Sequence, residues 1–73
     1  MEEEIRSILS RKDPQGYYVI VAEASARDLV KEWEKDVRIE EVGDRLIIRT
    51  RSRRVAERLA RRLASRNLLR FDL

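Results

Sequence analysis

The spacing of apolar residues changes from segment to segment, and each spacing predicts one kind of element. Ile5, Ile8 and Leu9 recur at the three- and four-residue intervals of a short helix. Residues 17–24 are rich in the β-branched and aromatic side chains typical of strands, and they stay apolar on both faces until Glu23. We therefore expect this strand to be central in its sheet. The expected elements are a helix over 2–11, a strand over 17–24, a helix from 25, strands over 37–42 and 45–51, a helix from 52 and a strand over 68–73.

Cap and stop residues separate these elements. Pro14 with Gly16 ends the first helix, because Pro cannot continue one. Ser25 is the expected cap of the second helix, with Asp28 completing a capping-box variant. Ser52 is the expected cap of the last helix. That helix has an apolar face of Val55, Ala56, Leu59, Ala60 and Leu63, and Asn67 is its expected left-handed stop.

The two strands over 37–42 and 45–51 form a predicted hairpin around Gly43-Asp44. Its register sets Val42 opposite Arg45, Ile39 opposite Ile48 and Arg38 opposite Arg49. Without the first helix the order is β-α-β-β-α-β, which predicts an α+β domain of ferredoxin-like type, with an antiparallel four-stranded sheet of order 4-1-3-2. We expect one domain over residues 1–73, in which a helix over 1–12 precedes a core over 17–73. Another four-stranded α+β layer is the alternative.

The sheet face turned away from the two longer helices is expected to be apolar. Its members are Tyr17, Val19, Val21, Ile47 and Leu68. The preferred cover is the first helix, folded across this face. A homodimer joined through the same face is the competing solution. A third arrangement docks the first helix beside the last one, against Ala56, Ala60 and Ala64.

The chemistry open to the chain is limited. Its 73 residues contain no His and no Cys, which excludes disulfides, thiolate chemistry and the common transition-metal and Ser-His sites. Glu40 and Glu41 point to opposite faces of their strand, and no Ser is followed by a plausible base. We expect no catalytic residue, no metal, no cofactor and no enzyme activity.

The segments that target proteins to membranes are also missing from the sequence. No apolar run approaches the ~20 residues needed to cross a bilayer. The acidic stretch 2–4 is the opposite of a signal peptide, which begins basic. We therefore expect a soluble, cytoplasm-compatible protein with no membrane partner.

The net charge of +3 conceals an uneven distribution. Residues 1–44 carry 7 basic and 12 acidic side chains, whereas 45–73 carry 10 Arg against 2 acidic ones. Asp28, Glu32 and Asp36 form a stripe at four-residue spacing on one helix, and Arg54, Arg58 and Arg62 form one on the other. Right-handed crossovers turn these two flanks toward each other, which predicts ion pairs between the helices.

A second basic group surrounds the Ser52 cap. It consists of Arg49, Arg51, Ser52, Arg53 and Arg54. Unpaired amides at a helix start, flanked by Arg, can bind an anion such as phosphate or sulfate. The alternative is a solvated loop with surplus Arg, since the glycine-rich cradle and the Lys of a phosphate loop are missing.

Nucleic acid is not the expected partner of the sheet face. RNA-recognition motifs share this topology and stack bases on aromatics of the two central strands. Here residues 45–51 include no aromatic side chain, and only Tyr17 projects onto the open face. Apart from the homodimer, we expect no partner.

Taken together, these residues resemble computationally designed ideal α/β proteins of ferredoxin-like type. The resemblance covers 17–73 and lies in the Ser-x-x-Asp helix start at Ser25, the Gly43-Asp44 hairpin, short loops, Arg/Glu-filled surfaces and the lack of His and Cys. It implies a structural scaffold without evolved activity, with paired Arg stripes and no sizeable pocket. The alternative function is a small anion- or nucleic-acid-binding module that uses the Arg cluster around Ser52.

Overall fold

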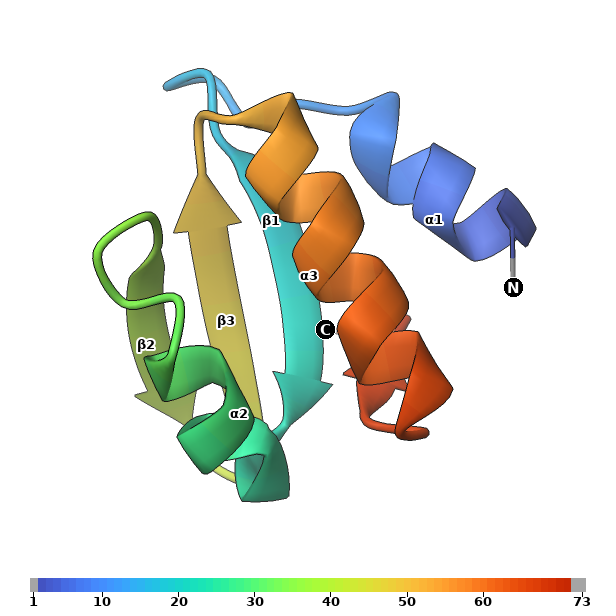
Figure 1. Cartoon of the computed structure of the whole chain (residues 1–73). Coiled ribbons are helices and arrows are strands. Elements are labelled where there is room, and N and C mark those ends of the chain that lie inside the picture. The colour runs from blue at the N-terminus through green and yellow to red at the C-terminus, as the bar shows by residue number, and fades with distance from the viewer. Residues whose placement is uncertain (1, 72–73) are drawn as a thin grey trace.

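The computed structural model describes residues 2–71, so Met1, Asp72 and Leu73 lie outside it. Residues 2–71 form a small α+β domain with a four-stranded antiparallel sheet (Figure 1). In chain order the elements are α1 (Glu2–Leu9), β1 (Tyr18–Glu23), the 3-10 turn η1 (Ala24–Ala26), α2 (Arg27–Lys31), β2 (Arg38–Val42), β3 (Arg45–Thr50), α3 (Arg53–Ser65) and β4 (Leu69–Arg70). The last strand begins at Leu69, and residues 72–73 of the predicted strand lie outside the described residues.

The strands lie in the order β2-β3-β1-β4, and each neighbouring pair is antiparallel. β1 therefore has a strand on both sides, which confirms the central position predicted from its two apolar faces. Within residues 2–71, β4 is two residues long and pairs with Val21 and Ala22. Among residues 2–71, no strand pairs with the first half of β1 on that side.

The hairpin of β2 and β3 has the predicted register. Ile39 lies opposite Ile48, Arg38 opposite Arg49 and Val42 opposite Arg45. The turn between the strands contains Gly43 with φ +61°, a conformation that glycine adopts without steric strain. The alternation of apolar and polar side chains and the glycine in the turn thus favour the same pairing register of the two strands.

The core lies between one face of the sheet and the helices η1–α2 and α3. Alternate residues of β1 and β3 point into it, and the apolar stripe of α3 packs on them. Figure 1 shows α3 lying across this face of the sheet. The buried side chains of α3 are Ala56, Leu59, Ala60, Leu63 and Ala64. The ends of this helix confirm the prediction: Ser52 accepts a hydrogen bond from the amide of Val55, and Asn67 has φ +60°.

The prediction that Ser25 caps the second helix is wrong. β1 runs directly into η1, where the amide of Ala24 donates to the carbonyl of Asp44 at 3.0 Å. Ser25 is therefore the middle residue of a helical turn, and neither η1 nor α2 has a side-chain cap. After Lys31 the backbone continues through three-residue hydrogen bonds, such as Trp33 N–H to Val30 at 2.8 Å, so the α-helix is only five residues long.

The preferred prediction for the first helix is also wrong. α1 packs against α3 and β1 instead of crossing the open face of the sheet (Figure 1). Ile5 is 2% exposed and belongs to the same core cluster as Ala56 and Ala60. Small residues on α3 allow this close approach, and β1 provides the rest of the contact.

The Ile39–Ile48 pair supplies a test of where the core ends. Ile48 is 0% exposed and Ile39 is 37% exposed, although they lie opposite each other on the same sheet face. We expect Ile48→Ala to lower the free energy of unfolding by about 2–5 kcal/mol, because it leaves a cavity. Ile39→Ala is the matched control, with an expected loss of about 1 kcal/mol or less. Urea denaturation measures both; equal losses would contradict the observed core boundary.

Candidate functional site

Arginine side chains cover the open face of the sheet. Arg45, Arg49 and Arg70 project from β3 and β4 onto this face, beside Val19, Val21 and Ile47 according to the strand register. Their side chains are only 26%, 34% and 21% exposed. The aliphatic part of a long basic side chain can lie on apolar surface while its charged end remains in water. These three residues, which we call the Arg layer, thus cover part of the face that the first helix was expected to cover.

Carboxylates hold the Arg layer in place. Arg49 pairs with Glu40 at 3.1 Å and lies 4.0 Å from Asp13. Arg70 pairs with Glu23 at 3.2 Å and lies 3.6 Å from Asp44. Asp44 also lies 3.6 Å from Arg45. Most of the charge on this face is therefore compensated locally.

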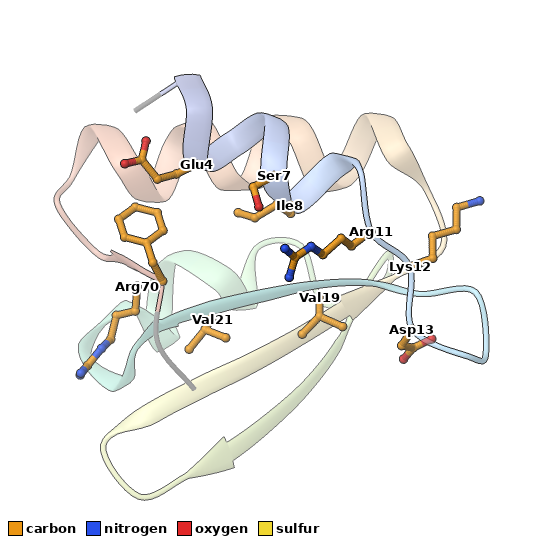
Figure 2. Close-up of a pocket in the computed structure, with 10 residues that line it drawn as sticks. Glu4, Ser7, Ile8, Arg11, Lys12, Asp13, Val19, Val21 and Arg70 are labelled. Carbon is orange, nitrogen blue, oxygen red and sulfur yellow. The ribbon is translucent and has the colours of Figure 1, made fainter.

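A cavity of about 390 Å³ lies between α1, the open side of β1 and the end of β4. Val19 and Val21 from β1 line it together with Ser7 and Ile8 from α1 (Figure 2). Its wall therefore combines apolar side chains with a charged rim that includes Arg11. A sizeable cavity is contrary to what the scaffold hypothesis predicted.

The Arg cluster around Ser52 does not form one site. Arg49 lies on the sheet face and is paired with carboxylates. Arg51 lies over the ring of Tyr17, 4.5 Å from its centre, and donates to the carbonyl of Gln15 at 3.5 Å. Only Arg53 and Arg54 remain at the start of α3, and neither has a carboxylate within 4.0 Å in the part of the chain that the structure describes.

The backbone at the start of α3 is partly satisfied already. The Ser52 amide donates to the Thr50 hydroxyl at 3.1 Å, the Ser52 hydroxyl accepts from Val55 at 3.2 Å, and the Ser52 carbonyl accepts from Ala56 at 3.0 Å. The amides of Arg53 and Arg54 have no partner among residues 2–71. An anion here would have two amides and two flexible guanidinium groups as donors.

The acidic and basic stripes do not meet as ion pairs. Asp28, Glu32 and Asp36 have no ion pair with Arg54, Arg58 or Arg62, all six of which are described. Arg58 instead lies over the ring of Trp33, 5.8 Å from its centre. The physical reason is that α2 ends at Lys31, and a backbone with three residues per turn rotates Glu32 and Asp36 off the line that a continued α-helix would give them.

An ion pair that the sequence did not reveal ties α1 to α3. Both terminal nitrogens of Arg61 donate to Glu2, one of them at 3.1 Å, and Arg61 also pairs with Glu57 one turn away at 3.1 Å. The hydrogen bond from Arg61 and then its charge lower the pKa of Glu2. The same bonds raise the pKa of Arg61 above its usual range. The signal in the sequence is weak, because Glu2 and Arg61 meet only if α1 docks on α3.

A second unpredicted feature is a groove beside Tyr17. Lys35, Arg38 and Arg51 line it together with the half-buried Tyr17. Sequence reasoning found Arg51 but not the other two cations, because they follow α2 and reach Tyr17 only through the pairing of β2 with β3.

Comparison of the chain with protein-family models, curated proteins and solved structures finds no match. Within residues 2–71, no group of three or more acidic side chains is arranged to hold a metal ion. Of the helices in this described range, none combines the length and the apolar character that a bilayer crossing requires.

The absent ion pairs lead to an expected outcome for Glu32. Because Glu32 has no basic partner within 4.0 Å in the described part of the chain, we expect Glu32→Arg to change the free energy of unfolding by no more than about 0.5 kcal/mol. Glu34→Arg, in the same exposed turn, is the matched control. A large loss by urea denaturation for Glu32→Arg alone would show that Glu32 interacts attractively with α3.

The bond between Glu2 and Arg61 predicts a pH dependence. The folded-state pKa of Glu2 lies below its unfolded value, so its contribution is present above the unfolded pKa and is lost as the pH falls through the folded pKa. We therefore expect Glu2→Gln to destabilise the protein at about pH 7 and to have a smaller effect at about pH 3, below the usual Glu range. Denaturation at both pH values measures this. Glu3→Gln is the control with equal charge, and a similar loss there would contradict a specific bond.

Proposed function

We propose that the chain is a structural scaffold of ferredoxin-like type, without evolved biochemical activity and without catalytic residues. The order β2-β3-β1-β4 supports this topology, because it is the order 4-1-3-2 counted from the opposite edge. The position of α2 and α3 over one face of the sheet supports it too (Figure 1).

The observation that carries the scaffold proposal is the fit between backbone conformation and residue type. In the described part of the chain the positions with positive φ are Gly16, Gly43 and Asn67, all residue types that tolerate it. Natural proteins usually depart from such local rules at the sites where they act. The resemblance to designed proteins, and hence a designed origin, belongs to the same proposal.

We further propose that the scaffold is monomeric. The Arg layer supports a monomer because it covers the face that a homodimer would have to bury. Joining two copies there would remove several guanidinium groups and their carboxylates from water, which is unfavourable unless each remains fully paired.

A small anion-binding module is the second candidate function. Two expectations of the scaffold hypothesis fail. The acidic and basic stripes do not form ion pairs with each other, and a cavity of about 390 Å³ is present where no sizeable pocket was expected. Arg53 and Arg54, with their two amides, are the residues of the predicted cluster that remain open to a phosphate or sulfate ion. They would bind it through charge-assisted hydrogen bonds.

A thermal-shift screen separates the two candidates. A ligand that binds only the folded state raises the unfolding temperature in a concentration-dependent, saturable way. For the scaffold we expect no saturable rise with phosphate, sulfate or common metabolites at about 0.15 M salt. A saturable rise with phosphate that disappears in the double variant Arg53→Gln/Arg54→Gln would overturn the scaffold proposal and support the anion module. The matched control is Arg62→Gln/Arg66→Gln, which removes the same charge at the other end of α3.

A further inference from the structure

The basic surplus of the open sheet face is concentrated at one end. In its middle and at the opposite end, Arg45, Arg49 and Arg70 are within 4.0 Å of carboxylates. At the end where β1 begins, Arg38 and Arg51 have no such partner in the described part of the chain. Lys35 lies in the same region and is also without an ion pair among residues 2–71.

These three cations border the groove beside Tyr17. The groove has a volume of about 260 Å³ and opens onto the surface. One acidic side chain, Asp36, also lines it, and Arg49 on its wall is already paired with Glu40. The groove thus offers three basic groups against one acidic group that has no ion pair of its own, which favours an anionic occupant.

Two guanidinium groups lie close to the Tyr17 ring in the groove. The guanidinium of Arg51 lies 4.5 Å from the centre of the Tyr17 ring, and that of Arg38 lies 6.0 Å from it. Both distances lie within the range of cation–π attraction. The carboxylate of Asp13 accepts the amide of Tyr17 at 2.9 Å, and the carbonyl of Gln15 accepts from Arg51. These two hydrogen bonds hold Tyr17 and Arg51 in place before any ligand arrives.

The geometry points to single-stranded nucleic acid as the ligand of this groove. Lys35, Arg38 and Arg51 contact successive phosphates, and one unpaired base stacks on the planar surface that Arg51 and Tyr17 form. Bases stack on guanidinium planes as well as on aromatic rings, and each unstacked base has a free face for this contact. The site lies at the end of the sheet, so it does not need the central aromatic side chains whose absence argued against a sheet-centred RNA platform.

Other polyanions fit the groove less well. The bases of a duplex are already stacked on one another, so they have no free face to place against Tyr17 and Arg51. An acidic peptide matches the charge but leaves the planar surface of Arg51 and Tyr17 unused. Binding of a single strand goes beyond the proposed scaffold role, since a surface can bind a ligand without having been selected to do so. The groove also uses different residues from the small-anion site at the start of α3.

Fluorescence polarisation with a labelled oligothymidylate of about ten nucleotides tests the inference, because sites of this kind span about 4–16 nucleotides. We expect binding at about 50 mM salt that weakens steeply toward about 200 mM. The double variant Arg38→Gln/Arg51→Gln should bind about tenfold more weakly, with a salt slope reduced by about 1.4, or about 0.7 for each lost phosphate contact. Circular dichroism checks that the variant is folded.

Two charge-matched variants make the test specific. Arg62→Gln/Arg66→Gln should retain most of the affinity, because both residues lie at the far end of α3. Arg53→Gln/Arg54→Gln distinguishes the groove from the small-anion site. Equal loss in all three variants would overturn the inference in favour of general charge attraction, and loss only in Arg53→Gln/Arg54→Gln would place the site at the start of α3.

A measurement on the protein without substitutions tests the inference even if the variants fail to fold. Amide chemical shifts recorded during titration with the unlabelled oligonucleotide should change most at Tyr17, Val37 and Thr50, which line the groove. Absence of binding at low salt, tighter binding of poly-glutamate or of duplex DNA, or shifts confined to α3 would each overturn the inference.

Discussion

The structure depends on the burial of β1 on both of its faces. One face, with Tyr18, Ile20 and Ala22, packs into the core, while Val19 and Val21 on the other face also need cover. A fold of this size has helices enough for only one side of its sheet, which α2 and α3 occupy. The second side is covered by the stems of arginines, whose charged ends reach nearby carboxylates. The high charge content of the chain and its apolar central strand are therefore parts of one arrangement.

The elements that could be predicted from the sequence are those whose local signals agree. The register of the β2–β3 hairpin follows from a two-residue periodicity and a turn that only a few residue types can form, so two separate constraints give the same answer. The ends of α3 follow from the chemistry of Ser52 and Asn67 in the same way. Ser25 shows the limit of such reasoning. Its side chain is a suitable cap, but the helical turn already begins at Ala24, one residue too early for Ser25 to cap it.

The position of α1 could not be predicted, because more than one surface of the fold could bury its apolar side chains. Ile5 would be buried equally by the open sheet face or by the small residues of α3. In the structure α1 packs against α3 and β1, and no local signal in the sequence distinguishes this arrangement from the other. The groove beside Tyr17 was hidden for a related reason. Lys35, Arg38 and Arg51 are distant from Tyr17 in the sequence and meet it only through the sheet. The predicted cluster around Ser52 shared one of these cations but placed its centre on the neighbouring helix.

The outer edge of β2 has a consequence for association between molecules. All five residues of this strand are exposed, and its outer backbone groups face solvent with no fifth strand in the described part of the chain. Such an edge usually invites another strand. If a second molecule added here in an antiparallel register centred on Glu40, it would set that carboxylate against its own copy and each Ile39 against a Glu41. Like charges opposite each other are destabilising. The charge pattern of this strand thus makes the sheet a poor template for its own extension.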